Sequence, residues 1–197
     1  MDNYKKIINY VKKNNGVITT RKVEEMGVHK QYLKNLVDQN RLEHVERGVY
    51  IDVDAFEDRL FNLQTRFTKG IFSHDTALFL HNLTDRTPLK LTMTFPASYN
   101  TVNVKKRDVE VYKANPDIYP LSITHVKTNT GNSVRVYSME KTLCDIVRGY
   151  SRVEKEQVVQ AFQMYVRRND KNLSELYRLA KVLKVDSKIR AYMDVLL

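Results

Sequence analysis

The stretch of sequence that decides the fold is NGVITTRKVEEMGVHKQYLKNLVDQNRLEHVERGVYI, residues 15–51. Thr20 can cap a short helix over residues 21–26, and Gly27 can end that helix by supplying a left-handed residue. A second helix is predicted over residues 29–39. Its apolar residues recur at three- and four-residue spacing and therefore predict one buried stripe: Leu33, Leu36 and Val37.

The opposite face of the second helix is polar and basic. Its side chains can donate hydrogen bonds to phosphates and base edges: His29, Lys30, Gln31, Lys34 and Asn35. Residues 42–45 and 49–51 are predicted strands that flank Glu46-Arg47-Gly48, where the glycine suits a tight turn. Two short helices followed by a hairpin with an arginine at its tip predict a winged helix-turn-helix.

The charge of this segment favours DNA as its partner. Residues 1–50 hold ten Lys and Arg against six Asp and Glu, and cations near phosphates release counterions. In this hypothesis the second helix enters a major groove, while Arg21, Lys22 and Arg47 contact the backbone or the minor groove. Two other interpretations stay open, because winged helices also mediate protein contacts and a basic helix face can be solvated surface only.

Length and composition set the class of protein. The 197 residues carry a net charge of +10 and are 42% hydrophobic, which fits one large or two small folded domains and an anionic partner. No apolar run approaches the roughly 20 residues that cross a bilayer, and the N-terminus lacks a signal-peptide pattern. We therefore expect a cytoplasmic protein without membrane contact. The single Cys144 excludes an internal disulfide and a multi-cysteine zinc site.

The chain is predicted to form two domains. Residues 1–67 contain the winged helix-turn-helix and a preceding helix over residues 3–13. They end with a connecting helix over residues 52–67, whose apolar residues are Ala55, Phe56, Leu60, Leu63 and Phe67. Residues 68–197 form the second domain, and the whole chain is of the α+β class.

The second domain is predicted to hold a small mixed β-sheet followed by a helical bundle. Residues 89–95 alternate as Leu-Lys-Leu-Thr-Met-Thr-Phe and predict a half-buried strand. Further strands are predicted over residues 102–104, 109–113, 121–127 and 134–137. Helices are predicted over residues 74–82 (capped by Ser73), 139–149 (capped by Ser138), 153–168, 173–183 and 187–197.

The sequence predicts no catalytic residue, metal site or cofactor. His74 and His81 lie seven apart on one predicted helix, without the spacing of a zinc-binding helix, and are interpreted as exposed or capping residues. The sequence also contains no Gly-rich phosphate loop. Cys144 is interpreted as a packed core thiol, and Lys141 and Asp145, four apart, can pair on one helix face.

A metal-dependent nuclease is the enzymatic alternative. Asp108 and Glu110 would share one face of a predicted strand. Lys113 would fall on the opposite face by the two-residue period of a strand, so a cluster that needs this lysine beside the carboxylates is out of register.

Three segments together carry a family resemblance. They are ITTRKVEEMGVHKQYLKNLVDQNRLEHVERGVY (residues 18–50), GIFSHDTALFLHNLTDRTP with the strand LKLTMTFP (70–96), and VYSMEKTLCDIVR (136–148). The chain resembles the AbiEi family of antitoxins, from type IV toxin–antitoxin systems of abortive phage infection. The resemblance extends over nearly the full chain.

The resemblance implies a function. Members of this family repress their own operon by binding inverted repeats in its promoter, and they counteract a nucleotidyltransferase toxin without a stable complex. Their C-terminal domain is needed for antitoxicity and helps cooperative binding to DNA. Double-stranded DNA is therefore the expected physical partner and the toxin the functional one. The alternatives are a winged-helix repressor unrelated to toxin control and an antitoxin that contacts its toxin directly.

The C-terminal part of the chain is also basic. Residues 151–197 hold ten Lys and Arg against six Asp and Glu. This surface could be a second DNA contact, an RNA-binding face related to antitoxicity, or solvated helix surface.

Overall fold

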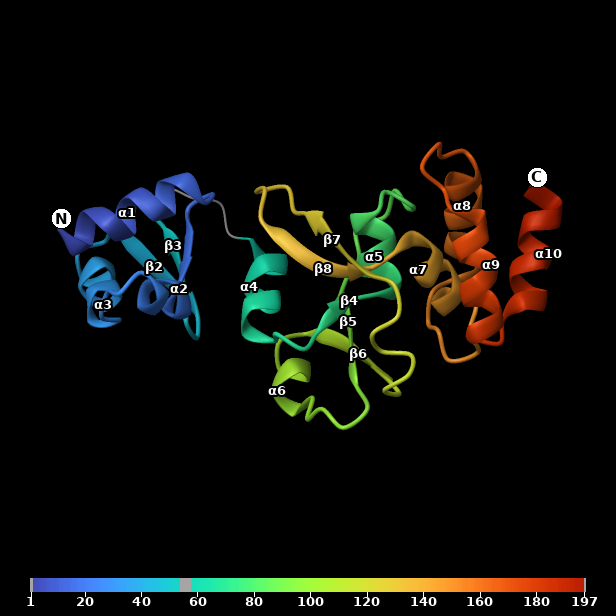
Figure 1. Ribbon diagram of the computed structural model, residues 1–197, viewed down its shortest axis with the longest axis horizontal. Helices are drawn as coiled ribbons and strands as arrows, with labels where there is room; N and C mark the ends of the chain where they lie inside the picture. The colour runs from blue at the N-terminus through green and yellow to red at the C-terminus, as the bar shows by residue number, and fades with distance from the viewer. Residues whose placement is uncertain (1, 54–57, 197) are drawn as a thin grey trace. The chain divides into compact units, whose positions relative to one another are not determined.

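The structure is a computed structural model that describes residues 2–53 and 58–196 (Figure 1). The chain divides into two compact units, which are described separately. Unit 1 comprises Met1–Thr68 and Lys127–Val134, and unit 2 comprises Lys69–Val126 and Arg135–Leu197. The chain therefore passes between the units three times. The prediction that residues 1–67 bind DNA and that residues 68–197 carry antitoxicity concerns function and stays a prediction.

Unit 1 begins with three helices, α1 (Asn3–Lys13), α2 (Thr20–Glu25) and α3 (Gln31–Asp38). The predicted cap of α2 is one residue off, because the Thr19 hydroxyl accepts from the Lys22 amide at 3.1 Å and Thr20 is the first helical residue. Gly27 has a φ of +69°, as the end of α2 requires. Helix α3 starts two residues later than predicted.

The apolar stripe of α3 lies in the core of unit 1. Leu33 and Leu36 are fully buried, whereas Val37 is half-buried at the edge of the same cluster. They pack with the apolar face of α1, whose buried residues are Ile7, Ile8 and Val11. Burial of this stripe turns the opposite face of α3 towards solvent.

The predicted hairpin is present and belongs to a three-stranded antiparallel sheet. Strands β1 (Val17–Thr19), β2 (Leu42–Glu46) and β3 (Val49–Asp52) lie in the order β1-β3-β2. Gly48 has a φ of +78° in the turn, which only glycine adopts without strain. Strand β1 has only three residues, too few for a periodic pattern, and pairs with β3 through Ile18 and Tyr50.

The connecting helix is shorter than predicted. Helix α4 runs over Arg59–Arg66, and Asp52, the predicted first residue, instead ends β3. Leu63 and Phe67 are buried as expected and Leu60 is half-buried. Ala55 and Phe56, also predicted for this helix, lie outside the described residues.

Asp58 fixes the start of α4. One of its carboxylate oxygens accepts from the amide of Phe61 at 2.9 Å, and the side chain is 4% exposed. The other oxygen accepts from the hydroxyls of Thr128 and Thr130, each at 2.5 Å, and from the side-chain amide of Asn132 at 3.1 Å. Residues 127–134 are thus joined to α4 through one buried carboxylate.

The main sheet is mixed, as predicted. Its strands are β4 (Ile71–Phe72), β5 (Leu91–Pro96), β6 (Val109–Ala114), β7 (Ile123–Lys127) and β8 (Ser133–Tyr137), in the order β6-β5-β4-β8-β7. Strand β4 pairs antiparallel with β5 and parallel with β8, and β5 pairs parallel with β6. The short α6 (Val102–Lys105) stands where a strand over residues 102–104 was predicted, and that prediction was wrong.

The predicted half-buried character of β5 was also wrong. Leu89 lies outside the strand and is 97% exposed, whereas Thr92, Met93, Thr94 and Phe95 are all buried, so both faces are covered. Two hydrogen bonds to Ser73 and α5 are made on this second face, although the Thr92 hydroxyl itself has no partner among the described residues. The Thr94 hydroxyl donates to the Ser73 hydroxyl at 2.8 Å, and the Thr76 hydroxyl accepts from the Thr92 amide at 2.7 Å.

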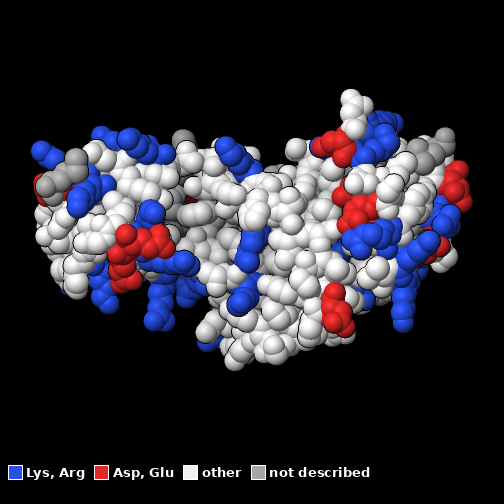
Figure 2. All heavy atoms as spheres, in the orientation of Figure 1, with Lys and Arg blue, Asp and Glu red and all other residues white. Residues whose placement is uncertain are grey.

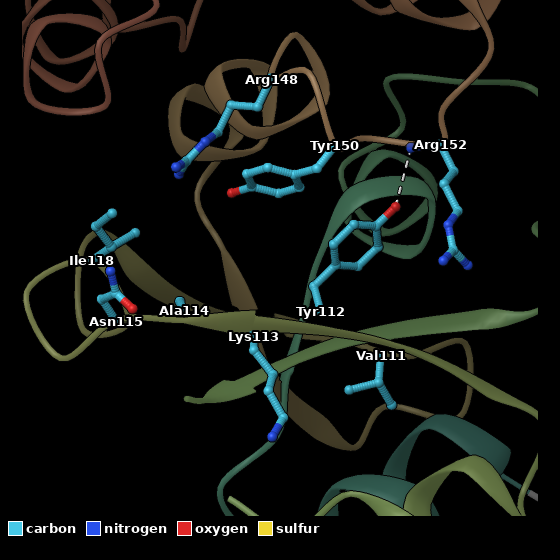
Figure 3. A pocket seen from close by; sticks show the side chains of 9 residues that line it. All are labelled: Val111, Tyr112, Lys113, Ala114, Asn115, Ile118, Arg148, Tyr150 and Arg152. Atoms are coloured by element: carbon cyan, nitrogen blue, oxygen red, sulfur yellow. Dashed lines mark hydrogen bonds between the residues drawn. The ribbon is translucent and has the colours of Figure 1, made fainter. Parts of the chain in front are cut away.

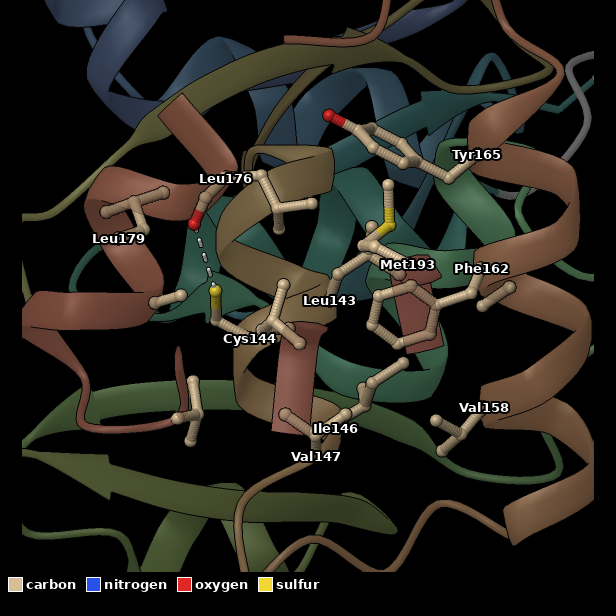
Figure 4. Packing of buried hydrophobic residues seen from close by; sticks show 14 of the residues in the cluster. Leu143, Cys144, Ile146, Val147, Val158, Phe162, Tyr165, Leu176, Leu179 and Met193 are labelled. Carbon is tan, nitrogen blue, oxygen red and sulfur yellow. Dashed lines mark hydrogen bonds between the residues drawn. The ribbon is translucent and has the colours of Figure 1, made fainter. Parts of the chain in front are cut away.

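The helices of unit 2 form the largest core of the molecule (Figure 4). They are α5 (His74–Leu80), α7 (Met139–Ile146), α8 (Lys155–Val166), α9 (Leu173–Val182) and α10 (Asp186–Leu196). Ser138 caps α7 as predicted, accepting from the Lys141 amide. The Cys144 side chain is fully buried among them, which confirms a packed core thiol, and burial raises the pKa of the thiol to about 12.

The predicted pairing of Lys141 with Asp145 is confirmed, but the pair is buried and not at the surface. The Lys141 ammonium lies 2.5 and 2.7 Å from the two carboxylate oxygens of Asp145. The same ammonium stands 4.5 Å from the ring centroid of Tyr137. Removing Asp145 would leave the Lys141 ammonium buried without its carboxylate, and removing Lys141 would leave Asp145 with only the more distant Arg148 at 3.9 Å, so either change is strongly destabilising.

His74 is neither exposed nor a capping residue, so that interpretation was wrong. The side chain is 2% exposed, and neither ring nitrogen has a hydrogen-bond partner among the described residues. The imidazole stacks on Tyr112 with 3.7 Å between centroids and 12° between planes. Burial lowers the pKa of His74 to about 4, although the nearby Asp145 carboxylate opposes this shift.

We predict that His74 makes the fold acid-sensitive. The unfolded chain binds a proton at this imidazole below its ordinary pKa of about 6.5 and the folded chain only near 4, so stability falls as the pH drops through this window. At pH 5 this residue costs about 2 kcal/mol relative to pH 7. Urea unfolding of the wild type and of His74→Phe at both pH values measures the effect.

The Phe variant should lose that part of the pH dependence, while replacement of the exposed His125 by Gln should leave it unchanged. An identical pH dependence in wild type and His74→Phe would contradict the assignment.

Candidate nucleic-acid interface

The first part of the candidate interface is the exposed face of α3 with the residues just before it. His29, Lys30, Gln31 and Lys34 are all exposed. The Nδ1 of His29 accepts from the Gln31 amide at 3.2 Å, so this imidazole caps the helix and leaves Nε2 for other partners. His29 and Lys30 thus directly precede the N-terminus of α3, whereas Gln31 and Lys34 belong to the helix itself.

Asn35 has a different place from its four predicted companions. It is half-buried, and its side-chain amide donates to the Tyr4 hydroxyl of α1 at 2.9 Å. Its Oδ1 accepts from the Gln31 amide side chain at 3.2 Å. The rings of Tyr4 and Tyr32 also meet edge to face, with centroids 4.9 Å apart. Asn35 therefore ties α3 to α1 and orients Gln31.

The second part lies on α2, where two predicted DNA contacts share one acid. The Arg21 guanidinium lies 2.9 Å from a Glu25 carboxylate oxygen, and the Lys22 ammonium lies 3.4 Å from the other. The two cations lower the pKa of Glu25, so this acid stays ionised. In the protein without DNA, the two cations are thus partly neutralised by their own helix.

The third part is the tip of the β2–β3 hairpin, where Arg47 is exposed. The carbonyl of Gly48 accepts from the Thr20 amide at 2.9 Å, which joins the turn to the start of α2. Next to the turn, Glu46, the last residue of β2, forms an ion pair with Arg66 of α4. These two contacts hold the turn beside α2, so Arg47 projects from a fixed hairpin.

The view of the molecular surface agrees with this arrangement (Figure 2). Basic side chains project from the lower edge of unit 1, where α2, α3 and the hairpin tip lie in Figure 1, and others lie over α1. Acidic side chains gather near α2, which carries the exposed Glu24 and Glu25.

Two residues that position this surface, Tyr4 and Thr20, were not predicted to do so from the sequence. Tyr4 is 31 residues from Asn35, and the bond between Thr20 and Gly48 likewise joins positions far apart in the chain. The sequence indicated Tyr4 only as a core residue and Thr20 only as a helix cap, because no local pattern encodes a contact between residues so far apart in the chain.

The structure separates the residues of the nuclease alternative. Asp108 lies before β6 and pairs with Lys90 at 2.9 Å, whereas Glu110 pairs with Arg152 at 2.7 Å. The Lys113 ammonium donates to the Ala97 carbonyl at 3.1 Å. Across residues 2–53 and 58–196, no three His, Cys, Asp or Glu side chains are placed to hold a metal ion together.

Comparison with known proteins supports a regulator. Residues 5–51 match the sequence model of a family described as "Transcriptional regulator, AbiEi antitoxin". The resemblance to AbiEi antitoxins is thereby confirmed for this segment, which contains α1 to β3, and it supports the role of an antitoxin-type transcriptional regulator. No curated protein sequence matches the chain.

The fold of nearly the whole chain is similar to a solved structure, "Crystal structure of RV2827C protein from Mycobacterium tuberculosis". The two chains are 14% identical, and the match covers 91% of this chain and 71% of that chain with a TM-score of 0.58. At this identity the likeness concerns the fold, and it agrees with the predicted α+β class. In the described part of the chain, every helix is too short or too polar to span a bilayer.

We predict that replacing Glu25 by Gln tightens binding to DNA. The change releases Arg21 and Lys22 from their shared acid, so affinity should rise about two- to fivefold at low salt. Fluorescence anisotropy with duplex DNA at several salt concentrations measures the change. Glu24→Gln removes the same charge without releasing the two cations and is the matched control. Equal gains from both variants would mean that Arg21 and Lys22 do not contact DNA.

Proposed function

We propose that this protein is the antitoxin of a type IV toxin–antitoxin system, which binds inverted repeats in its promoter, represses its own operon and counteracts a nucleotidyltransferase toxin. The observation that carries the proposal is the solvent-facing surface of α3 together with the exposed Arg47, both within the segment that matches AbiEi regulators. Promoter binding follows from this surface, whereas the choice of toxin follows from the family resemblance.

In the proposed complex the N-terminus of α3 reaches base edges in a major groove. Lys30 and Lys34 then contact guanine edges or flanking phosphates, Gln31 can bond adenine, and His29 offers its Nε2. Asn35 contributes at the margin, mainly by orienting Gln31. Arg47 reaches the minor groove or backbone, and Arg21 and Lys22 hold the phosphates next to α2.

The antitoxic activity is assigned to unit 2, without a stable complex with the toxin. Cooperative self-association on DNA accompanies binding to the two halves of an inverted repeat. Two alternatives use the same winged helix differently. A protein-binding antitoxin would contact its toxin directly through it, and a repressor unrelated to toxin control would use it for repression alone.

We predict that the variant Lys30→Ala, Lys34→Ala, Arg47→Ala loses promoter affinity. If each cation meets one phosphate, the slope of log affinity against log salt should become less steep by about 2.7. If Lys30 reads guanine, Lys30→Ala alone should cost about 1–3 kcal/mol on the operator and little on unrelated DNA. Gel shifts with the promoter fragment measure both quantities in the full chain.

A matched control removes the same charge from unit 2 through Lys155→Ala, Lys181→Ala and Lys184→Ala, all of which are exposed. Unchanged promoter affinity in the α3 and hairpin variant would contradict the assignment of Lys30, Lys34 and Arg47 as DNA contacts. A loss in the control would locate a second DNA contact on the basic C-terminal helices.

We also predict that repression and antitoxicity separate. The same α3 and hairpin variant, expressed from an unrelated promoter, should fail to repress its operon yet protect cells from the toxin encoded beside it. Growth after toxin induction and a promoter fusion give the two readouts. Loss of protection together with repression would contradict the division of labour. Co-purification of a stable complex with the toxin would favour direct contact.

A further inference from the structure

A pocket of about 480 Å³ opens on unit 2 where β6 ends beside the segment that follows α7 (Figure 3). This volume lies in the range of sites for small molecules. Its lining includes two aromatic rings, two guanidinium groups and the polar Asn115 beside Ile118; the first four belong to Tyr112, Tyr150, Arg148 and Arg152.

The aromatic part of the pocket combines a fixed ring with an open one. Tyr112 is held from behind by the stacked imidazole of His74, and its hydroxyl accepts from the Arg152 amide at 3.1 Å. Tyr150 is 49% exposed, and its ring centroid lies 6.1 Å from that of Tyr112 at an angle of 42°. Burial raises the pKa of both phenols, so their hydroxyls stay neutral at physiological pH.

The cationic part of the pocket depends on the buried pair behind it. The Arg148 guanidinium lies 4.7 Å from the centroid of the Tyr150 ring and 3.9 Å from a carboxylate oxygen of Asp145. Asp145 is already neutralised by Lys141, its closer partner at 2.5 Å. The positive charge of Arg148 is therefore not cancelled locally and acts on the pocket. The Arg152 guanidinium lies on the other side of Tyr112 and pairs with Glu110, so Arg148 is the cation beside Tyr150.

We propose that this pocket binds a nucleoside monophosphate group, with the base stacked on Tyr150 and the phosphate held by Arg148. Stacking on an aromatic ring and pairing with arginine are the means by which proteins hold unpaired nucleotides without a Gly-rich loop. The group comes either from a free nucleotide or from the phosphorylated end of a single strand. The site is independent of duplex binding by unit 1, because its residues all belong to unit 2.

The test uses the full chain with Tyr150→Trp as a reporter. The protein has no tryptophan, so this substitution keeps an aromatic ring and supplies one fluorescence signal at the site. Adenosine monophosphate should quench it with saturation, and about tenfold more tightly than adenosine or inorganic phosphate, since each supplies only one of the two contacts. Calorimetry on the wild type checks that the reporter does not create the site.

Two variants and one control separate recognition from folding. Arg148→Met should weaken binding of adenosine monophosphate about tenfold, and Tyr150→Ser should do the same without touching a buried residue. The control Arg178→Met removes a guanidinium that is paired with Glu175 on α9 and should bind like the wild type. Circular dichroism confirms the fold of each variant.

The source of the nucleotide is decided by a pentanucleotide with and without a 5′ phosphate. Tighter binding of the phosphorylated strand than of free adenosine monophosphate assigns a strand end, and weaker binding assigns a free nucleotide. The proposal is overturned if neither probe gives a saturable signal at millimolar concentration. It is also overturned if Arg148→Met and Tyr150→Ser, both folded, bind as tightly as the wild type.

Discussion

The surface of unit 1 depends on the burial of one stripe of α3 against α1. Leu33 and Leu36 are removed from water by the apolar face of α1, each contributing about 1.5–3 kcal/mol. Because a helix has two sides, this burial also decides which side chains face solvent, and those include Lys30, Gln31 and Lys34. Apolar packing alone would leave α3 free to rotate against α1. The hydrogen bond from the Asn35 side chain to the Tyr4 hydroxyl fixes the orientation of α3.

Charge in this protein is more evenly balanced than the net value of +10 suggests. On α2, Glu25 holds two cations, and on the C-terminal helices Arg168, Arg178 and Arg190 each pair with a nearby acid. Lys30, Lys34 and Arg47 are exposed on unit 1, and Arg148 keeps its charge in unit 2 because Lys141 occupies Asp145. Which cations lie close to an acid is a property that composition does not reveal.

The sequence predicted those parts of the fold that repeat a local period. The stripe of α3, the hairpin with Gly48, the cap at Ser138 and the pair of Lys141 with Asp145 follow from spacing alone. Strands β1 and β4 are too short to have a period. Strand β5 is covered on both faces, where the Thr94 hydroxyl donates to Ser73 and the Thr92 amide donates to the Thr76 hydroxyl. Most of the candidate DNA surface could be predicted, whereas the pocket of unit 2 could not. The two rings of this pocket, Tyr112 and Tyr150, are far apart in the sequence. The orientation of Tyr112 depends on the buried His74, which the sequence had indicated as an exposed or capping residue.

The carboxylate of Asp58 has a consequence for the order of events during synthesis. Its three side-chain partners follow 70 to 74 residues later in the chain. At about 5–20 residues per second, a ribosome needs roughly 4–15 s to deliver them. Until then α4 begins with a carboxylate that lacks three of its four donors, and the unit whose translation starts first cannot be completed before residue 134 has been made. Such a nascent chain can acquire its full N-terminal unit only when much of the second has already been made.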